Sequence, residues 1–166
     1  CSSDLSLQTE GYQIDGVRNR GYRLAEDTDI LSLAGIGKYL KPICGNLRIH
    51  MTRKTGSTNE EVRIKASEGE PEGYVLIAEC QTNGKGRVGR TFFSPAETGI
   101  YMSLLLRPGR YSLPQASGLT TMAAAACCEA IENVSDEKAA IKWVNDIYVR
   151  GKKVSGILTE ASLGLE

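Results

Sequence analysis

An excess of charge of one sign is what this sequence most clearly lacks. Its 20 basic and 20 acidic residues cancel over 166 positions, so no overall field attracts the chain to nucleic acid or anionic lipid, and any anion site has to be local. Long apolar runs are also missing. No run approaches the roughly 18 residues of a membrane-spanning helix, and no signal peptide is visible, so we expect no membrane partner.

Cysteine and histidine are too sparse or too poorly spaced for several kinds of site. The five cysteines are odd in number and contain no C-x-x-C pair, and Cys127 and Cys128 are adjacent. This spacing argues against a disulfide framework or a zinc site and favours a reducing, cytoplasmic location. The lone histidine, His50, alternates within an apolar strand, which favours a structural role over that of a general base. No Ser/His/Asp or Cys/His arrangement is evident.

The N-terminal quarter of the chain differs in pattern from the rest. Residues 11–25 contain two short alternating stretches around Asn19–Gly21 and predict a β-hairpin. Residues 27–41 have apolar side chains roughly at helical spacing and predict a helix, which Asp27 or Thr28 would cap. We expect this second segment to be a linker.

From Leu47 onward, strands and helices alternate. Thr58 with Glu61 three positions later predicts a capping box, and Gly69 is placed to end that helix. The continuous apolar run 74–81 is typical of a strand buried on both faces. The expected strands are 47–52, 74–81, 100–107, 140–144, 147–150 and 153–160, and the expected helices are 57–69 and 113–132. This order predicts an α/β (α+β) fold, a mixed β-sheet with flanking helices.

The least ordinary stretch is the glycine-rich loop ECQTNGKGRVGRTFFSP, residues 79–95. Its glycines resemble both a dinucleotide fingerprint and a phosphate-binding loop, but both motifs require a helix directly afterwards, and residues 91–95 are poorly suited to start one. Between positions 82 and 94 the charged residues are Lys85, Arg87 and Arg90, with no acid among them. The composition indicates a loop that surrounds an anion; the alternative is a solvated, flexible surface loop.

Four ordered motifs together resemble one family. GSTNEE (56–61), QTNGKGRVGR with FSP (81–95), KWVND (142–146) and KVSGIL (153–158) resemble the catalytic domain of biotin protein ligases, over about residues 47–161. The resemblance implies a class II synthetase-like fold and a reaction in two steps. Biotin and ATP, with Mg²⁺, form biotinyl-5′-AMP and pyrophosphate, and a lysine of the biotin carboxyl carrier protein of acetyl-CoA carboxylase then takes the biotinyl group.

The resemblance also assigns roles to individual residues. Arg87 and Lys153 are expected to be catalytic, because a carboxylate that attacks an α-phosphate needs cations and positioning rather than a protein nucleophile. The expected biotin contacts are Ser57, Thr58, Asn59, Gln81, Lys85, Gly86, Arg87 and Lys153. The expected nucleotide contacts are Arg87, Arg90, Phe92, Asn145 and Asp146, with Mg²⁺ near Asp146. Without the motifs, Ser57–Asn59 would be assigned to helix capping and Lys153 to a solvated turn.

Some positions depart from the family pattern. Lys85 stands where the family often has arginine, Phe92 where tryptophan is common, and Val144 where proline is usual. A lysine gives a point charge in place of a planar fork. The family's catalytic domain continues beyond the motifs present here, so we expect residues 47–166 to be an incomplete catalytic domain.

The segment IDGVRNRGYRLAE (14–26) resembles the wing and exit strand of the winged-helix domain of bifunctional biotin ligases, which repress biotin synthesis genes. We therefore expect residues 1–25 to be a remnant of a DNA-binding domain and residues 26–46 to be a linker helix. Arg18, Arg20 and Arg23 would then contact operator phosphates. The family often dimerises with the adenylate bound, so a homodimer is also expected. A lipoate–protein ligase and a non-catalytic biotin sensor remain alternatives.

Overall fold

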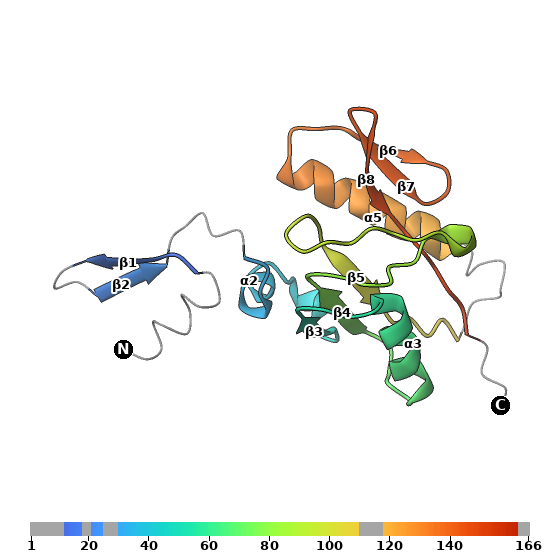
Figure 1. Cartoon of the computed structure of the whole chain (residues 1–166), viewed down its shortest axis with the longest axis horizontal. Helices are drawn as coiled ribbons and strands as arrows, with labels where there is room; N and C mark the ends of the chain where they lie inside the picture. The colour runs from blue at the N-terminus through green and yellow to red at the C-terminus, as the bar shows by residue number, and fades with distance from the viewer. Residues whose placement is uncertain (1–11, 18–20, 25–29, 110–117, 163–166) are drawn as a thin grey trace. The chain divides into compact units, whose positions relative to one another are not determined.

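The computed structural model describes residues 12–17, 21–24, 30–109 and 118–162. They belong to two compact units, Cys1–Asn46 and Leu47–Glu166 (Figure 1). In the first unit, β1 (Ile14–Val17) pairs with β2 (Gly21–Leu24) in antiparallel register. The predicted hairpin is confirmed, while its turn, including Arg18 and Arg20, lies outside the described residues.

The helix predicted over residues 27–41 is much shorter in the structure. Helix α2 is Leu33–Gly37, and the Ser32 hydroxyl caps it by accepting the Gly35 N–H at 3.0 Å. The prediction was wrong about length because two glycines lower helix propensity and Pro42 begins a separate 3₁₀ turn, Pro42–Cys44. The expected caps, Asp27 and Thr28, lie outside the described residues.

The second unit contains a mixed three-stranded sheet, as predicted. Its strands are β3 (Arg48–Thr52), β4 (Tyr74–Ala78) and β5 (Tyr101–Leu104). They lie in the order β3-β4-β5, with β3 parallel and β5 antiparallel to β4. All five residues of β4 are buried, which confirms the prediction of a strand covered on both faces.

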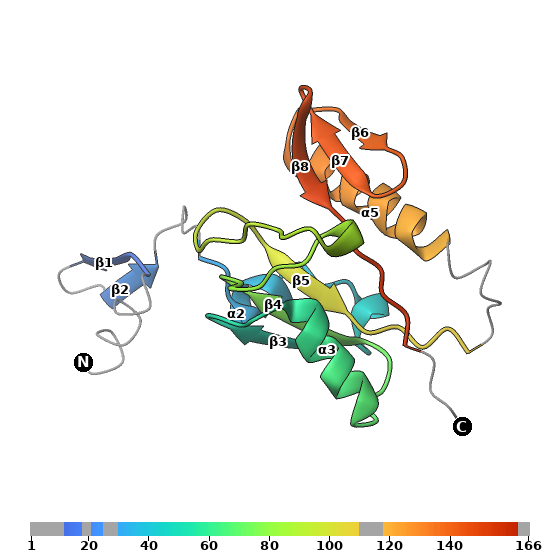
Figure 2. The ribbon, with the colours of Figure 1, turned by 45° about the vertical axis from the view of Figure 1, so that its right-hand side comes forward.

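Helix α3 (Thr58–Ser67) lies against β4 and β5 (Figure 2). Its Val62 packs into a core with Tyr74, Leu76 and Leu105. Gly69 ends the helix as predicted: its φ is +88°, and the N–H groups of Gly69 and Glu70 return to the carbonyls of Ala66 and Lys65. That pair of bonds is a Schellman motif, in which a left-handed residue favours glycine.

The predicted capping box at the start of α3 is wrong. Ser57 is the N-cap residue and makes no capping bond with its side chain, and Thr58 is the first helical residue. Gln81 Oε1, from 23 residues away, accepts the Thr58 backbone N–H at 2.8 Å and lies 3.1 Å from the Thr58 hydroxyl. A distant side chain therefore satisfies the helix start, which local sequence cannot reveal.

An antiparallel sheet follows, packed on α5 (Gly118–Val134). Its strands, in order, are β6 (Ala139–Lys142), β7 (Asp146–Val149) and β8 (Lys152–Gly156). Trp143 and Val144 lie in the turn instead of the predicted strand, and β8 ends earlier than predicted. Arg150 and Gly151 both have positive φ, the geometry of a tight hairpin turn. None of the described helices combines the length and hydropathy that a bilayer crossing requires.

Candidate functional site

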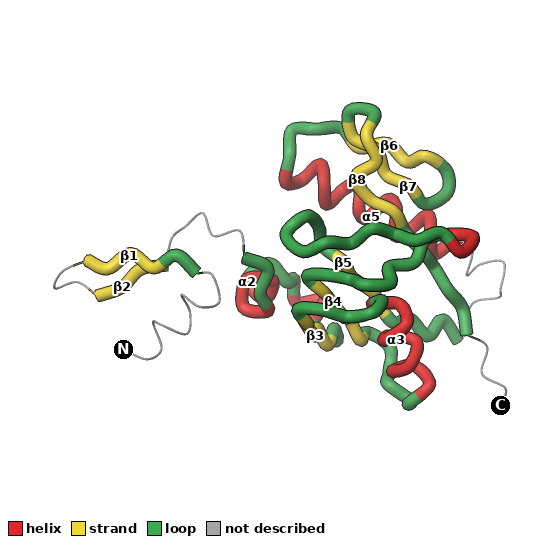
Figure 3. Tube along the Cα trace, in the orientation of Figure 1, coloured by secondary structure: helices red, strands yellow, loops and turns green. Residues whose placement is uncertain are grey.

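The glycine-rich loop leaves the buried strand β4 and returns as an irregular hairpin (Figure 3). Gln81 pairs with Ser94, and Lys85 with Thr91, in antiparallel bridges. Its tip is one 3₁₀ turn, Arg87–Gly89, and no α-helix follows before β5. The dinucleotide and phosphate-loop interpretations therefore lack the helix N-terminus on which their chemistry depends.

Two features of the loop show why its sequence is unusual. A Cβ on Gly84 would lie 2.7 Å from Ser94 Oγ and closer still to the Phe92 carbonyl oxygen, so only glycine fits at this crossing. At the tip, Val88 has φ 57° and ψ 41° and is 95% exposed. The left-handed conformation costs a β-branched residue about 1–2 kcal/mol, and no packing compensates for this strain.

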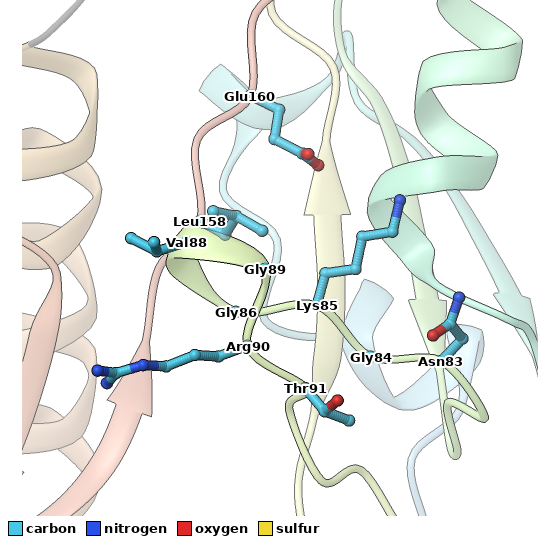
Figure 4. A pocket seen from close by; sticks show the side chains of 10 residues that line it. All are labelled: Asn83, Gly84, Lys85, Gly86, Val88, Gly89, Arg90, Thr91, Leu158 and Glu160. Carbon is cyan, nitrogen blue, oxygen red and sulfur yellow. The ribbon is translucent and has the colours of Figure 1, made fainter.

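The loop borders a cavity of about 350 Å³. Loop residues 83–86 and 88–91 line it together with Leu158 and Glu160, which follow β8 (Figure 4). In this view Lys85 extends toward α3, whereas Arg90 extends to the opposite side of the loop. The cavity thus brings the loop together with a segment about 70 positions away in the sequence, and it includes an acidic residue that the sequence did not predict.

Lys85 is held by an acidic residue of α3. Its Nζ donates to Glu60 Oε2 at 2.9 Å, and Glu60 also accepts a hydrogen bond from Arg63. Hydrogen bonds from Arg63 first and Lys85 second lower the pKa of Glu60 to about 2, although its side chain is partly exposed to solvent. The glycine loop is therefore tied to the first turn of α3 by an ion pair.

The start of α3 presents the hydroxyls that the sequence singled out. Ser57 and Thr58 are each 4% exposed, and the Ser57 hydroxyl does not cap the helix, which leaves it available to a ligand. Gln81 contacts Thr58 and, through Nε2, donates to Ser94 Oγ at 3.0 Å. Three of the predicted biotin-binding residues are thus brought together.

Asn59 is engaged by the protein on both ends of its amide. Nδ2 donates to the Leu158 carbonyl at 3.3 Å and to Glu160 Oε2 at 2.9 Å, and Oδ1 accepts from the buried Ser103 hydroxyl. The Asn59 side chain therefore connects α3, β5 and the segment after β8 by hydrogen bonds. The sequence analysis did not predict a role for Ser103 or Glu160. The alternation of buried and exposed residues in β5 indicates only that Ser103 faces the interior.

The two cations predicted to be catalytic, Arg87 and Lys153, each contact one of two adjacent residues, Asn145 and Asp146. Arg87 Nη1 donates to Asn145 Oδ1 at 3.0 Å, and Lys153 Nζ lies 2.8 Å from Asp146 Oδ1. That carboxylate oxygen accepts no well-aligned hydrogen bond from the described residues, so the contact with Lys153 is an ion pair without favourable hydrogen-bond geometry. Lys153 also lies over Gly156, where an added Cβ would be 3.1 Å from Nζ.

Asn145 also connects the glycine-rich loop to the segment that follows β8. Its Nδ2 donates to the Ile157 carbonyl at 3.1 Å, and its own carbonyl accepts the Ile157 N–H at 2.9 Å. A smaller cavity, of about 170 Å³, lies here between Arg87, Thr120 and the residues on either side of these bonds. Residues of the glycine-rich loop therefore line two cavities.

The remaining predicted residues are less constrained. Arg90 and Phe92 are exposed, and the Phe92 backbone closes the loop through its N–H to the Gly84 carbonyl at 2.8 Å. His50 stacks on Tyr74 with ring centroids 4.6 Å apart, in line with a structural role. Within the described ranges, no group of three or more His, Cys, Asp or Glu residues could hold a metal ion.

Comparison with known families and sequences gives consistent matches. A family model described as the biotin/lipoate A/B protein ligase family matches residues 49–164. The bifunctional ligase/repressor BirA of Bacillus subtilis is 38% identical over 154 residues, which are 93% of this chain and 47% of that protein. The biotin–[acetyl-CoA-carboxylase] ligase of Mycobacterium tuberculosis is 33% identical over 119 residues, 69% of this chain and 45% of that protein.

Solved structures agree. A biotin protein ligase from Aquifex aeolicus in complex with biotin and ATP superposes with a TM-score of 0.58 at 33% identity, covering 69% of this chain and 47% of that one. A ligase from Leishmania major with biotinyl-5-AMP gives a TM-score of 0.62 at 25% identity, covering 69% and 52%. The chain spans about half the length of the curated relatives it matches.

Proposed function

The chain belongs to the biotin/lipoate A/B protein ligase family, and on this premise we propose that the protein is a biotin protein ligase. It activates biotin with ATP and transfers the biotinyl group to a lysine of the biotin carboxyl carrier protein of acetyl-CoA carboxylase. The observation that carries the proposal is the convergence of Arg87, from the glycine loop, and Lys153, from β8, on Asn145 and Asp146.

In the first step, a carboxylate oxygen of biotin attacks the α-phosphorus of ATP, the bond to the bridging oxygen breaks and pyrophosphate leaves. Two anions must be held together while negative charge spreads over the phosphoryl oxygens. The Arg87 guanidinium has the fork geometry to bridge the carboxylate and the α-phosphate, and Lys153 supplies a second positive charge. Without ligand, Asn145 and Asp146 hold these cations, and the substrate anions take their place.

In the second step, the ε-amine of the carrier lysine attacks the biotinyl carbonyl, AMP leaves and the amine loses a proton. The hydroxyls of Ser57 and Thr58, with Gln81, bind the ring system of biotin at the start of α3, while Asn59 holds the surrounding segments. Lys85 and Gly86 belong to the loop that covers the ligand. Closing this loop protects the anhydride from water.

On the nucleotide side, we propose that Arg90 contacts the pyrophosphate and Phe92 the adenine. Mg²⁺ arrives with ATP, because the phosphates supply the oxygen ligands this ion prefers. Asp146 offers one carboxylate, already paired with Lys153 at 2.8 Å. Its role toward Mg²⁺ therefore requires Lys153 to turn toward the substrate.

The test is transfer of biotin to a biotin carboxyl carrier protein, with lipoate as competitor. The proposal expects ATP-dependent labelling of the carrier lysine with biotin and no labelling with lipoate. Labelling by lipoate alone would identify a lipoate ligase. Calorimetric binding of biotin without any labelling or adenylate would identify a non-catalytic sensor.

A second candidate function, transcriptional repression, is supported by the hairpin β1–β2 and by the 93% of the chain that matches a bifunctional ligase/repressor. We propose that residues 1–25 belong to a winged-helix DNA-binding domain, that residues 26–46 link it to the catalytic domain, 47–166, and that the protein works in the cytoplasm. DNA selection from a random library, with and without biotin and ATP, tests repression. Sedimentation under the same conditions tests the homodimer.

A further inference from the structure

The first turn of α3 is bonded to both walls of the larger cavity. One wall is the glycine-rich loop, where Lys85 Nζ donates to Glu60 Oε2 at 2.9 Å. The other wall is the segment after β8, where the Leu158 carbonyl and the Glu160 carboxylate accept from Asn59 Nδ2 at 3.3 and 2.9 Å. Asn59 and Glu60 are adjacent in the helix, so a single turn connects two segments that are distant in the sequence.

The Glu60 carboxylate is oriented by its own helix. Its Oε1 accepts from Arg63 in the same helix, and its Oε2 accepts from Lys85. Figure 4 shows the Lys85 side chain extended toward α3. One carboxylate oxygen is thus held by the helix, and the other is directed at the loop.

The backbone of Lys85 lies in the most regular part of the loop. The two arms of the hairpin are joined on either side of it, by the Phe92 N–H to the Gly84 carbonyl at 2.8 Å and by the Gly86 N–H to the Arg90 carbonyl at 2.6 Å. The 3₁₀ turn at the tip begins directly afterwards. An ion pair at Lys85 therefore restrains the hairpin as a unit.

The three cations of the loop, Lys85, Arg87 and Arg90, have different partners. Arg87 donates to a neutral amide, that of Asn145, at 3.0 Å. Within the part of the chain that the structure describes, Lys85 alone of the three is paired with a carboxylate. An ammonium that already faces a carboxylate attracts a substrate anion less than a guanidinium beside a neutral partner does. Lys85 is thus suited to hold the loop, and Arg87 to hold an anion.

We propose that Glu60 is a positioning residue, whose ion pair with Lys85 holds the glycine-rich loop on α3 and slows the release of the bound adenylate. In this role the Lys85 ammonium contacts Glu60 and not the carboxylate of biotin, which differs from the biotin contact that the motif implies. The inference rests on the proposed function, because it requires an intermediate that must stay bound until the carrier lysine arrives.

The experiment measures the release of labelled biotinyl-5′-AMP from the purified protein. The intermediate is formed from labelled biotin and ATP with pyrophosphatase present, excess unlabelled biotin is added, and the adenylate that stays with the protein is followed over time. The side chains of Lys85 and Glu60 are 40% and 36% exposed, and an ion pair at such a site contributes modestly. We therefore expect Glu60→Gln to release the adenylate about two- to fivefold faster than the wild-type protein.

A double-mutant cycle tests whether the two side chains act as a pair. Lys85→Met should accelerate release by the same factor as Glu60→Gln, and the double variant should release the adenylate no faster than either single variant. Lys85→Arg keeps the ion pair and should retain the wild-type rate. If the two factors multiply in the double variant, the side chains act separately and the inference is overturned.

A ligand without a carboxylate tests the other role of Lys85. Calorimetry compares biotin with the analogue in which an alcohol replaces the carboxylate. If Lys85 holds the loop, Lys85→Met leaves the ratio of the two affinities at its wild-type value, whereas Arg87→Ala reduces it. If Lys85→Met weakens the binding of biotin and not that of the alcohol, Lys85 holds the carboxylate and the inference is overturned.

Glu68→Gln is the matched control. It removes an ion pair from the other end of the same helix, with Lys65 at 2.6 Å, and should leave the release rate unchanged. Thermal melts check that each variant is folded. Equal acceleration in Glu68→Gln and Glu60→Gln would overturn the inference.

Failure of the proposed function and failure of this inference give different results. If the wild-type protein forms no adenylate, the proposed function is wrong and this inference with it. If the adenylate forms and Glu60→Gln releases it at the wild-type rate, the inference alone is overturned.

Discussion

Glu60 shows how one residue organises the candidate site. It carries two cations at once, Arg63 from its own helix and Lys85 from the glycine loop. Both stabilise the ionised carboxylate, so its pKa in the folded protein lies below the ordinary value. The ion pair with Lys85 is therefore retained in mildly acidic solution, where a free glutamate would begin to protonate.

NMR titration of the side-chain carboxyl checks this account. We expect a pKa of about 2 for Glu60, against an ordinary value of 4.5. Because the folded pKa is depressed, the stability that Glu60 contributes is present above pH 4.5 and is lost as the pH falls from 4.5 to 2. Lys85→Met should raise the pKa of Glu60, and Arg63→Met should raise it by a larger amount, because the hydrogen bond from Arg63 lowers this pKa most. A wild-type pKa near 4.5 would contradict the paired geometry.

Gly84 tests the close crossing inside the loop. Replacing it with alanine sets a methyl group against the Phe92 carbonyl and Ser94 Oγ. Overpacking of this kind costs about 1–3 kcal/mol, so Gly84→Ala should lower the free energy of unfolding in urea by that amount and weaken biotin binding. Gly99→Ala is the control in the same connection, since its nearest neighbour, Tyr101 Oη, is at 3.4 Å. Equal free energies of unfolding for Gly84→Ala and Gly99→Ala would contradict the close approach of Gly84 to Phe92 and Ser94.

At the scale of elements, the ends of α3 depend on different kinds of contact. Its start is satisfied by Gln81, far away in sequence, and its end by the local Schellman turn at Gly69. Arg107 adds to the end by donating to the carbonyls of Ala66 and Glu70. The start of α3 thus involves two residues proposed to bind biotin, Thr58 and Gln81, whereas no residue that ends the helix is proposed to contact a ligand.

A glycine substitution at the end of α3 should affect stability alone. Gly69 has φ +88° with nothing within 4 Å of an added Cβ, so alanine there meets only backbone strain. Gly69→Ala should lower the free energy of unfolding by about 1–2 kcal/mol without changing biotin affinity. Gly56→Ala, which has space and no positive φ, should retain stability. A loss of affinity in folded Gly69→Ala would connect this turn to the site.

Elements with local causes could be predicted from the sequence. The strand β4, the hairpins and the end of α3 follow from apolar periodicity and glycine placement. The helix at 27–41 was predicted too long because periodicity outweighed its glycines. The prediction of a capping box was wrong because the Gln81 side chain, distant in sequence, accepts the Thr58 N–H. Ser103 and Glu160 were not predicted, since only the tertiary structure brings them to Asn59. The motif residues converged, but their ligand contacts remain predictions.

At the scale of the whole molecule, every residue proposed for adenylation belongs to the unit Leu47–Glu166. The balanced charge of 20 basic and 20 acidic residues leaves anion binding to a few local cations. We propose that Arg87 and Lys153 supply the positive charge. Their contacts with Asn145 and Asp146 keep the two side chains in position before the substrates bind. Catalysis then depends on two side chains much more than on the net charge of the surface.

The most direct test is biotin-dependent exchange of labelled pyrophosphate into ATP by the purified protein. The account predicts exchange that requires biotin and that falls about a hundredfold or more in Arg87→Ala and in Lys153→Ala, because each removes a preorganised charge worth about 2.7–4 kcal/mol. Arg150→Ala and Lys65→Ala, whose side chains pair with Glu137 and Glu68, should keep wild-type rates. No biotin-dependent exchange, or undiminished exchange in both active-site variants, would contradict it.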